Sequence, residues 1–375
     1  MMWRKYRKLR DRDVVIHVVA SLNFGGVEKR MEMLARSAAL GAWQHRFCAI
    51  GNGGAAEKRI KDMGAPVDCL GVSVAIPSIR SIWLLFCTFR RLRPQVVHTY
   101  GAEANFHGLI AARLAGVPVR IAEEIGIPSH SDRARWVFRQ IYRSARRVIG
   151  IAAPVKRWLV ESHEVPDWKA LTIEHQPVEM PNDATSSPGE DGKRFRMIFV
   201  GRLESVKNPI ILLDAMARIQ QEMPAEIWLV GDGSQRSMLE KRAVELGVNE
   251  RVHMLGYREC PADFVSQCDL FVQPSLSEGF SRALVEAMGC GVPVLASAVG
   301  GAPEIIDHGR TGWLLEQPTV EQLVADIRNV WMNRERLALV GRAGRESVLK
   351  RFEPTAYLQE LEALYGGLRN SDIKE

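Results

Sequence analysis

Short apolar stretches rich in β-branched residues alternate with amphipathic segments from one end of the chain to the other. This alternation is typical of parallel sheets whose strands are joined by crossover helices. In the first half of the chain it predicts strands at 14–20, 47–51, 67–71, 96–100, 120–124, 148–152 and 171–175. In the second half it predicts strands at 197–200, 227–231, 252–255, 270–273, 294–297 and 313–315. The pattern therefore predicts an α/β protein with two doubly wound, Rossmann-like domains.

A polar stretch separates the two series of predicted strands. Residues 179–193 are rich in turn-forming side chains and hold almost no apolar ones, as interdomain linkers do. We therefore expect an N-terminal domain over 1–178, a linker over 179–194, a C-terminal domain over 195–352 and a helical tail over 353–375. Because doubly wound sheets bind ligands outside the carboxyl ends of their strands, we expect the active site in a cleft between the two domains.

Composition and cysteine usage indicate a globular enzyme of a reducing compartment. Apolar residues make up 46% of the chain and charged residues 25%, values typical of folded globular proteins. The six cysteines are scattered without a Cys-x-x-Cys pair, so we expect free thiols rather than disulfides or a zinc site. The longest apolar run, 82–89, is too short to span a membrane, and the basic N-terminus lacks the apolar core of a secretory signal. We therefore expect a cytoplasmic protein.

The net charge of +6 is unevenly distributed along the chain. Six arginines lie between Arg133 and Arg147, together with the aromatic residues Trp136, Phe138 and Tyr142. On a helix these arginines would form a broad basic face. Such a face is either an ordinary solvated surface or a surface for anionic membrane lipid or a pyrophosphate-bearing acceptor. A nucleic-acid partner is disfavoured, because no recognised nucleic-acid module accompanies the charge.

Two glutamates in the second series of strands are the strongest candidates for chemistry. Glu278 stands in a glycine-containing turn, and Glu286 lies on the helix that this turn begins. Backbone amides at a helix N-terminus form a site suited to phosphate. If a sugar nucleotide places its pyrophosphate there, Glu278 can accept hydrogen bonds from hydroxyls of the sugar, and Glu286 from those of the ribose.

Four segments together resemble the family 4 retaining glycosyltransferases. Glu278 and Glu286 have the Glu-x7-Glu spacing of that family, and 201–207 resembles its Gly-Arg-Leu-x3-Lys segment. Residues 298–313 are similar to the turn and strand that close the family's nucleotide domain, and 22–28 resembles a glycine loop that faces the donor from the opposite domain. The matches follow the family's order over almost the whole chain. The resemblance implies the GT-B fold, in which two Rossmann-like domains face a cleft.

The resemblance also assigns roles to residues of the donor site. It implies that Arg202, Lys207 and Glu278 are catalytic. The two cations would contact the donor diphosphate, and the carboxylate would orient the donor sugar rather than act as a nucleophile. The resemblance implies no metal and no cofactor, since the nucleotide sugar is a substrate. The further donor-binding residues that it implies are Gly25, Gly26, Gly201, Tyr257, Arg258, Gly279, Phe280, Ser281 and Glu286.

A second, less specific resemblance concerns the acceptor side. The segment that begins at His98 is similar to a His-x-x-Gly-x-x-Ala-Asn pattern of transferases that build bacterial surface polysaccharide. His98, Tyr100 and Asn105 are therefore candidates for acceptor contact, while a buried, hydrogen-bonded role for His98 is an equal alternative. Many family members carry a histidine after the next strand, where this chain has Glu123 and Glu124. Because of this departure, Glu124 is a candidate for the acceptor-side polar group.

Together these features favour a retaining hexosyltransferase. We expect it to move a hexosyl or N-acetylhexosyl group from a nucleotide sugar, by family analogy a UDP-sugar, to a lipid-linked or surface glycan such as a polyprenyl-pyrophosphate-linked one. It would attach peripherally to the inner face of the cytoplasmic membrane, and the family resemblance implies a C-terminal helix that crosses back to the first domain. Two alternatives are a sugar-nucleotide epimerase of the same fold and a catalytically inactive scaffold that docks on membranes.

Overall fold

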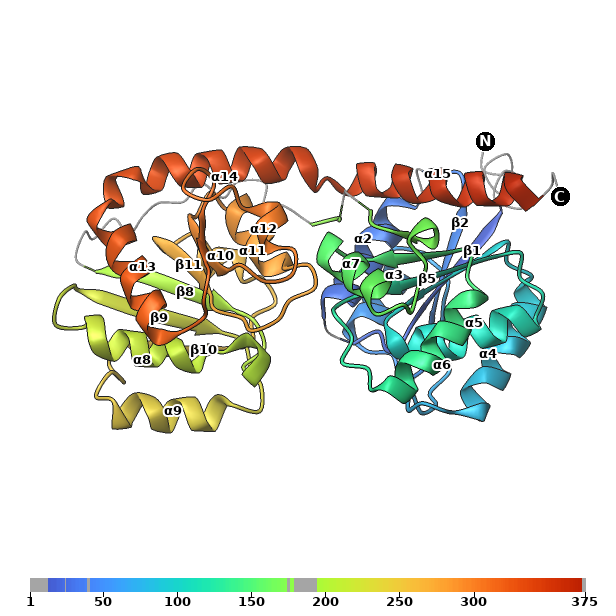
Figure 1. Cartoon of the computed structure of the whole chain (residues 1–375), viewed down its shortest axis with the longest axis horizontal. Coiled ribbons are helices and arrows are strands. Elements are labelled where there is room, and N and C mark those ends of the chain that lie inside the picture. The colour runs from blue at the N-terminus through green and yellow to red at the C-terminus, as the bar shows by residue number, and fades with distance from the viewer. Residues whose placement is uncertain (1–12, 24, 39–40, 174–175, 179–193, 373–375) are drawn as a thin grey trace. The chain divides into compact units, whose positions relative to one another are not determined.

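The chain divides into two compact units (Figure 1). Unit 1 comprises Met1–Pro177 and Phe352–Glu375, and unit 2 comprises Val178–Arg351. The expected linker over 179–194 lies, apart from residue 194, outside the described residues. The structure is a computed structural model that describes residues 13–23, 25–38, 41–173, 176–178 and 194–372; residues 371 and 372 are described by their backbone alone.

Unit 1 contains a sheet in which all pairings between the described strands are parallel. The strand order is β3-β2-β1-β4-β5-β6-β7, so the chain starts inside the sheet, moves out to one edge and then builds the other. This reversal creates a topological switch point between β1 and β4, where doubly wound sheets bind ligands. The strands are β1 (Val14–Val19), β2 (Gln44–Ala49), β3 (Val67–Cys69), β4 (Val96–Tyr100), β5 (Val119–Glu124), β6 (Arg147–Gly150) and β7 (Ala170–Leu171).

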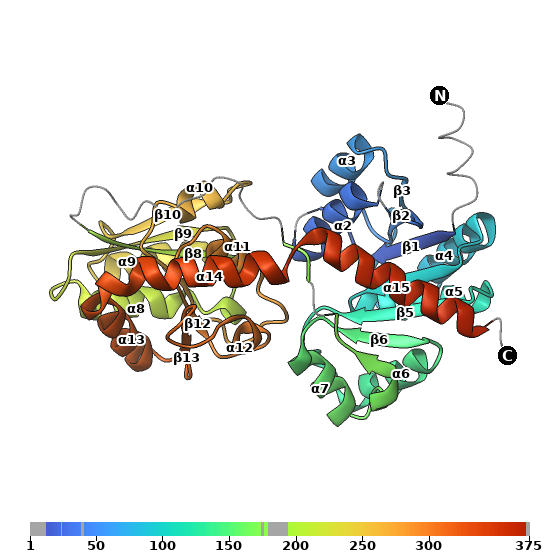
Figure 2. The ribbon, with the colours of Figure 1, turned by 90° about the horizontal axis from the view of Figure 1, so that it is seen from above.

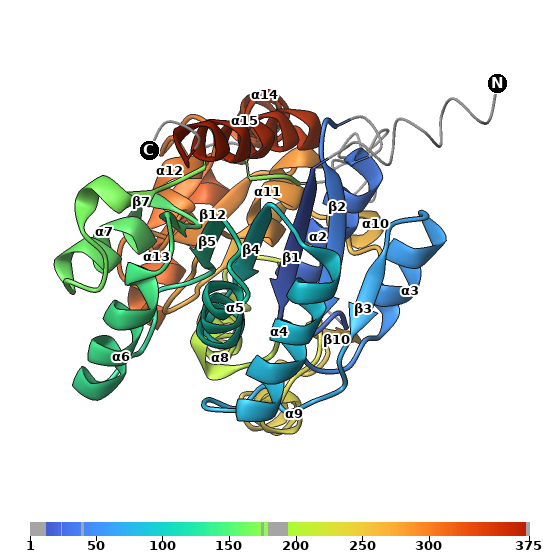
Figure 3. The ribbon, with the colours of Figure 1, turned by 90° about the vertical axis from the view of Figure 1, so that its right-hand side faces the viewer.

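Helices cover both faces of this sheet (Figure 3). They are α2 (Gly26–Ser37), α3 (Ala55–Asp62), α4 (Ile79–Leu92), α5 (Ala102–Leu114), α6 (Asp132–Arg143), α7 (Ala153–Glu161), the short 3-10 helix η1 (Asp167–Lys169) and α15 (Pro354–Asp372). Successive strand residues point to opposite faces, so Val15 packs with α2, α3 and α15, whereas Ile16 packs with α4 and α5. Figure 2 shows α15 lying across the strands of unit 1. Among the described residues, no helix combines the length and the apolar character needed to cross a membrane.

Unit 2 repeats this architecture with a second parallel sheet, in the order β10-β9-β8-β11-β12-β13. Its switch point lies between β8 and β11. The strands are β8 (Phe195–Val200), β9 (Ala225–Val230), β10 (Val252–Gly256), β11 (Leu270–Gln273), β12 (Val294–Ser297) and β13 (Trp313–Leu315). The helices are η2 (Ser205–Lys207), α8 (Ile210–Ile219), α9 (Arg236–Glu245), α10 (Ala262–Val265), α11 (Arg282–Gly289), α12 (Ala302–Ile305), α13 (Val320–Met332), η3 (Arg334–Arg336) and α14 (Leu337–Arg351).

The predicted fold class is confirmed, because each predicted strand has a counterpart in one of two doubly wound parallel sheets. The last predicted strand of the first half is shorter than expected. The structure has only Ala170–Leu171 in place of 171–175, and 174–175 lie outside the described residues. The apolar alternation predicts which segments become strands, but the hydrogen-bonded neighbour decides how far each one extends.

The basic segment after Arg133 does not form one continuous helix. The helix α6 ends at Arg143, and Arg147 is already the first residue of β6. The Lys169 ammonium group donates hydrogen bonds to the last two carbonyl oxygens of α6, at 3.1 and 3.2 Å. A cation at this position satisfies carbonyl groups that have no partner within a helix and opposes the negative end of the helix dipole.

Candidate active site

The two loops at the switch point of unit 2 bring candidate catalytic residues together. One loop follows β8 and contains Arg202 and Lys207, and the other follows β11 and contains Glu278. Because β8 and β11 are parallel neighbours, both loops leave the same carboxyl edge of the sheet. The amide of Leu276 donates a hydrogen bond of 2.8 Å to the carbonyl oxygen of Val206, which ties the two loops to each other.

Lys207 and Glu278 form an ion pair between these loops. Lys207 Nζ lies 2.6 Å from Glu278 Oε1, and the two side chains are 21% and 8% exposed. Lys207 ends the single 3-10 turn of η2, and the next residue, Asn208, has a left-handed backbone with a φ of 53°. Water screens such a pair less than it screens a surface pair. The loops thus hold a cation and a carboxylate at the place where this fold binds anionic ligands.

A hydrogen-bond network of uncharged residues surrounds Glu278, and of its members the sequence analysis identified only Ser281. Ser275 Oγ donates to Glu278 Oε1 at 2.7 Å, and the side-chain amide of Gln273 donates to the same oxygen. Ser281 Oγ donates to Gln273 Oε1 at 2.6 Å, which fixes the orientation of that amide. The signal in the sequence was the pair of polar residues, Gln273 and Ser275, at the end of an apolar strand.

The turn after β12 supports the Glu278 turn. Gly300 has a φ of +53°, and a Cβ atom at this position would lie 2.1 Å from the carbonyl oxygen of Glu278. The amide of Gly301 donates to the carbonyl oxygen of Gly279 at 2.8 Å. A side chain at position 300 would therefore displace the backbone that carries Glu278, and glycine is needed for both its conformation and its close approach.

Glu286 lies within α11, whereas Glu278 precedes this helix. Glu286 Oε1 is 3.5 Å from Arg282 Nη2, and the two side chains are 20% and 14% exposed. The helix begins at Arg282, directly after the segment 279–281. The N-terminal amides of α11 and the two carboxylates therefore belong to one short stretch of chain at the carboxyl edge of the sheet.

The other donor-side candidates of unit 2 are less enclosed. Arg202 is exposed on the loop after β8, and Gly201 immediately precedes it. Tyr257, which is 55% exposed, and the exposed Arg258 follow β10. Because β9 separates β10 from β8, these two residues lie farther along the carboxyl edge than the ion pair does.

Gly25 and Gly26 are exposed at the switch point of unit 1. They follow β1, and α2 begins at Gly26. Gly25 has a φ of 156°, and a Cβ atom there would lie 2.5 Å from Glu28 Oε2. Ser21 Oγ donates to Glu28 Oε1 at 3.3 Å. The Glu28 side chain thus folds back over Gly25 and occupies the space that a side chain at 25 would need.

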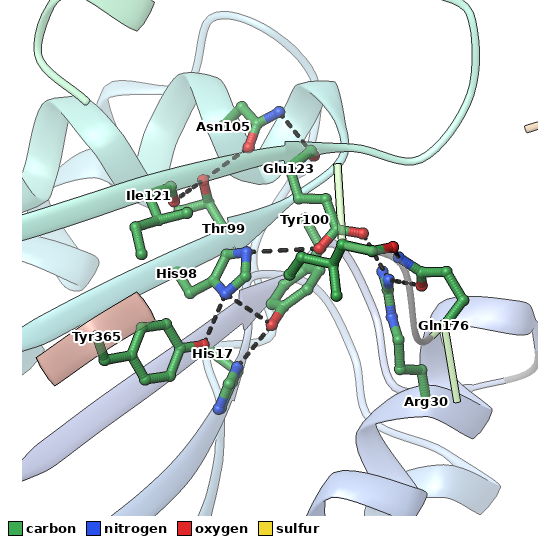
Figure 4. A network of polar contacts seen from close by, with 11 residues as sticks. His17, Arg30, His98, Thr99, Tyr100, Asn105, Ile121, Glu123, Gln176 and Tyr365 are labelled. Carbon is green, nitrogen blue, oxygen red and sulfur yellow. Dashed lines mark hydrogen bonds and ion pairs between the residues drawn. The ribbon is translucent and has the colours of Figure 1, made fainter. Parts of the chain in front are cut away.

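His98 and Tyr100 lie inside unit 1, on the face of the sheet that α15 covers (Figure 4). They are 0% and 2% exposed. His98 Nδ1 is 2.8 Å from the Tyr365 hydroxyl and 3.0 Å from that of Tyr100, which in turn is 2.8 Å from His17 Nδ1. Burial lowers the pKa of His98, although Glu123 opposes this effect, so the imidazole is neutral at pH 7. Of the two roles considered for His98, this environment fits the buried, hydrogen-bonded one.

Asn105 and Glu124 belong to a second buried network on the opposite face of the sheet. Asn105 Nδ2 donates to Glu124 Oε1 at 2.8 Å, and Thr99 Oγ1 donates to Asn105 Oδ1 at 2.6 Å. The Tyr142 hydroxyl also donates to Glu124 Oε1. Burial raises the pKa of Glu124 to about 7, even though the hydrogen bonds from Tyr142 and Asn105 lower it. The four acceptor-side candidates thus lie on opposite faces of the sheet, and a hydrogen bond of 3.1 Å from Asn105 Nδ2 to the carbonyl oxygen of Glu123 links the two groups (Figure 4).

A buried ion pair between Arg30 and Glu123 joins the network around His98, and the sequence analysis did not identify it (Figure 4). Arg30 Nη1 lies 2.5 Å from Glu123 Oε1, and the side chains are 3% and 0% exposed. Arg30 also donates to Gln176 Oε1 at 2.9 Å and lies over the ring of Tyr100, 5.0 Å from its centroid. Because the partners lie far apart in the sequence, no local pattern indicates this pair.

We predict that Glu124→Gln makes the protein more stable at pH 8 than the wild type, with little difference at pH 4.5. The pKa of Glu124 is about 7 in the folded protein and 4.5 in the unfolded chain. Its protonated form therefore stabilises the fold fully below pH 4.5, and this stabilisation is lost as the pH rises through 7. Glutamine keeps the neutral form, so the difference in unfolding free energy should grow by ~3 kcal/mol over this interval, at ~1.4 kcal/mol per pKa unit.

Urea denaturation of both proteins at several pH values measures this difference. The lowered pKa values of the buried His17 and His98 affect both proteins alike and cancel. A difference that stays constant from pH 4.5 to pH 8 would show that Glu124 is ionised in the folded protein at neutral pH.

Two family models match the chain, one in each unit. The model "Glycosyl transferase 4-like domain" matches residues 25–174, and the model "Glycosyl transferases group 1" matches residues 182–347. Each match covers most of one doubly wound unit. The chain therefore belongs to the family 4 glycosyltransferases, which have the GT-B fold.

Individual relatives agree with this assignment. N-acetyl-alpha-D-glucosaminyl L-malate synthase of Bacillus anthracis is 31% identical over 176 residues, which cover 47% of this chain and 46%, about half, of that protein. UDP-Gal:alpha-D-GlcNAc-diphosphoundecaprenol alpha-1,3-galactosyltransferase of Escherichia coli is 24% identical over 320 residues, which cover 80% and 82% of the two chains. Among solved structures, Anabaena Alr3699/HepE in complex with UDP and glucose has a TM-score of 0.81 at 21% identity and covers 94% of this chain and 99% of that one. This last likeness supports the fold.

Proposed function

We propose that the protein is a retaining, metal-independent glycosyltransferase. In this proposal it transfers a hexosyl or N-acetylhexosyl group from a UDP-sugar to a lipid-linked or surface glycan. The observation that carries the proposal is the Lys207–Glu278 pair at the switch point of unit 2, where Glu278 stands in the turn that leads into α11. The name of the Escherichia coli relative contains a UDP-sugar donor and a diphosphoundecaprenol-linked acceptor, which supports the choice of substrates.

The chemistry that we propose uses the fixed charges of this site. Negative charge develops on the departing diphosphate while the anomeric carbon becomes cationic. Lys207, Arg202 and the first amides of α11 would stabilise that negative charge, and preorganised groups of this kind supply much of the rate enhancement in many enzymes. Hydrogen bonds to Oε1 hold the Glu278 carboxylate in place. Its other oxygen, Oε2, would accept hydrogen bonds from hydroxyl groups of the donor sugar. Glu286 would accept hydrogen bonds from the hydroxyl groups of the ribose.

The purified protein, incubated with radiolabelled nucleotide sugars, provides the test. We expect transfer from a UDP-sugar to a polyprenyl-diphosphate-linked saccharide, retention of the anomeric configuration by NMR, and undiminished activity in EDTA. Because the name of the Bacillus anthracis relative contains L-malate, malate is included as a small acceptor. Epimerised sugar nucleotide without transfer would support the epimerase alternative, and loss of activity in EDTA would contradict the metal-free mechanism.

Glu286→Ala should weaken UDP binding by ~1.5–3 kcal/mol, the usual contribution of hydrogen bonds to a charged group. Calorimetry with UDP measures this change. Glu245→Ala is a matched control, because Glu245 is also a helical glutamate of unit 2 but has a side chain that is 64% exposed on α9. An affinity of Glu286→Ala within twofold of the wild type would exclude Glu286 from the nucleotide site.

We further propose that the protein is cytoplasmic and attaches peripherally to the inner face of the bacterial membrane through α6. Arg133 and Arg143 are exposed on this helix, and Trp136 is 64% exposed. Each basic residue near an anionic membrane surface contributes ~1 kcal/mol to the free energy of membrane binding. Flotation with phosphatidylglycerol vesicles should therefore decrease in Arg133→Glu/Trp136→Ala, but not in Trp83→Ala, which changes an exposed tryptophan of α4. Equal recovery of both variants would leave this face of α6 an ordinary solvated surface.

A further inference from the structure

Unit 1 contains a cavity beside the amino ends of its strands, whereas the switch point lies at their carboxyl ends. The cavity has a volume of about 560 Å3, which is within the range of small-ligand sites. Its walls come from α6 and from the segment 160–169, which leads through η1 into β7. Because α6 ends just before β6 and η1 ends just before β7, the cavity lies at the amino edge of the strands. Ligands of doubly wound sheets usually bind at the carboxyl edge, so this cavity differs in place from the candidate donor site. Its wall includes Tyr142, whose hydroxyl donates to the acceptor-side candidate Glu124.

Positive charge predominates around the cavity. The cationic side chains in its walls are Arg139, Arg143 and Lys169. Burial lowers the pKa of Lys169, and nearby cations lower it further, namely Arg147, Arg120, Arg143 and Arg146. The carboxylates in the walls are Glu164 and Asp167, and Asp167 is 76% exposed and 3.6 Å from Lys156. The field of these groups favours an anionic ligand and disfavours a cationic one.

Two polar atoms in the cavity wall have no hydrogen-bond partner among the described residues. Glu164 is 1% exposed, and its Oε1 lies 2.9 Å from His130 Nδ1, but its Oε2 has no partner. Arg139 Nε is likewise buried without a partner. A buried polar atom without a partner costs ~1–3 kcal/mol. Both atoms also have almost no accessible surface, so they contribute to the charge around the cavity and not to direct contact with a ligand.

An exposed tryptophan completes the wall. Trp168 is 69% exposed, and Lys169 Nζ and the Arg147 guanidinium lie 5.3 and 6.0 Å from its ring centroid. The face of an indole carries partial negative charge. The C–H groups on one face of a pyranose ring carry a small positive charge and complement such a surface, whereas inorganic phosphate gains nothing from it.

We propose that this cavity binds a saccharide that carries an acidic group, as a sugar phosphate does. The acidic group accepts hydrogen bonds from the guanidinium groups of Arg139 and Arg143, and the sugar ring stacks on Trp168. A neutral sugar leaves the arginines without an anion, and an amine is repelled by the basic residues. The inference rests on unit 1 alone and does not depend on the transferase activity.

Calorimetry on the full chain with glucose 1-phosphate tests the proposal. We expect at least tenfold weaker binding in Trp168→Ala and in Arg139→Gln. Trp136→Ala should bind within twofold of the wild type, because Trp136 is equally exposed on α6 but does not line the cavity. Lys207→Ala should also bind normally, which separates this site from the candidate donor site.

Comparison with other ligands defines the chemical class of molecule that the cavity binds. Glucose and inorganic phosphate should each bind at least tenfold more weakly than glucose 1-phosphate, and competition by glucuronate would support the proposal with a carboxylate as the acidic group. Equal affinity for inorganic phosphate would overturn the saccharide assignment in favour of a simple anion site. No binding of any sugar phosphate, or a Trp168-dependent attachment to phosphatidylglycerol vesicles in its place, would overturn the proposal.

Discussion

Lys207→Ala should lower the turnover number by ~100-fold or more while leaving the fold intact, as expected when a preorganised donor to developing negative charge is lost. Lys207 is the cation that the structure places directly on Glu278, at 2.6 Å. Its removal leaves the carboxylate with the hydrogen bonds from Ser275 and Gln273, so the Glu278 turn should keep its position. Single-turnover transfer from the nucleotide sugar measures the chemical step, and thermal unfolding measures the fold.

A matched control separates this effect from a general change of charge. Lys241→Ala removes an exposed lysine of α9 in the same unit and should leave turnover within twofold of the wild type. Arg202→Ala should resemble Lys207→Ala, with a loss of ~100-fold, because we assign both cations to the diphosphate. A Lys207→Ala enzyme that keeps a third or more of wild-type turnover would contradict the role of Lys207.

The sequence predicts the fold well because local patterns specify it. Runs of β-branched residues at regular intervals predict both sheets, and the turn residues between them indicate where each strand ends. The donor-side candidates Lys207 and Glu278 also stand in recognisable local segments, although 71 residues separate them. Their contact follows from topology, since β8 and β11 become neighbours only when the sheet reverses its strand order.

The interior of unit 1 could not be predicted in the same way. His98 and Tyr100 end a strand and thus resemble residues of a ligand site. The structure instead covers their face of the sheet with α15, and the Tyr365 hydroxyl that bonds His98 lies 267 residues away in the sequence. The same reasoning applies to Arg30 and Glu123, which are 93 residues apart. Burial of a polar strand residue depends on which distant helix covers it, and no local pattern carries that information.

Removing one partner of the buried Arg30–Glu123 ion pair should strongly destabilise unit 1. Glu123→Gln should lower the unfolding free energy by about 3–5 kcal/mol, because it leaves the Arg30 guanidinium buried without its counter-charge. Burial alone would raise the pKa of Glu123, but Arg30 and then His98 lower it below its usual value. A lowered pKa stabilises the fold above the unfolded pKa of 4.5, and this stabilisation is lost as the pH falls through the folded pKa.

Urea denaturation at pH 7 measures the cost of Glu123→Gln, and the double variant Arg30→Met/Glu123→Gln tests its cause. If the cost comes from an uncompensated buried charge, removing that charge should restore more than half of the lost stability, since a buried pair is often replaceable by uncharged residues of similar volume. The difference between wild type and Glu123→Gln should also shrink as the pH falls below 4.5. A double variant less stable than Glu123→Gln would show instead that Arg30 stabilises unit 1 through contacts that do not require the carboxylate, such as those with Gln176 and the Tyr100 ring.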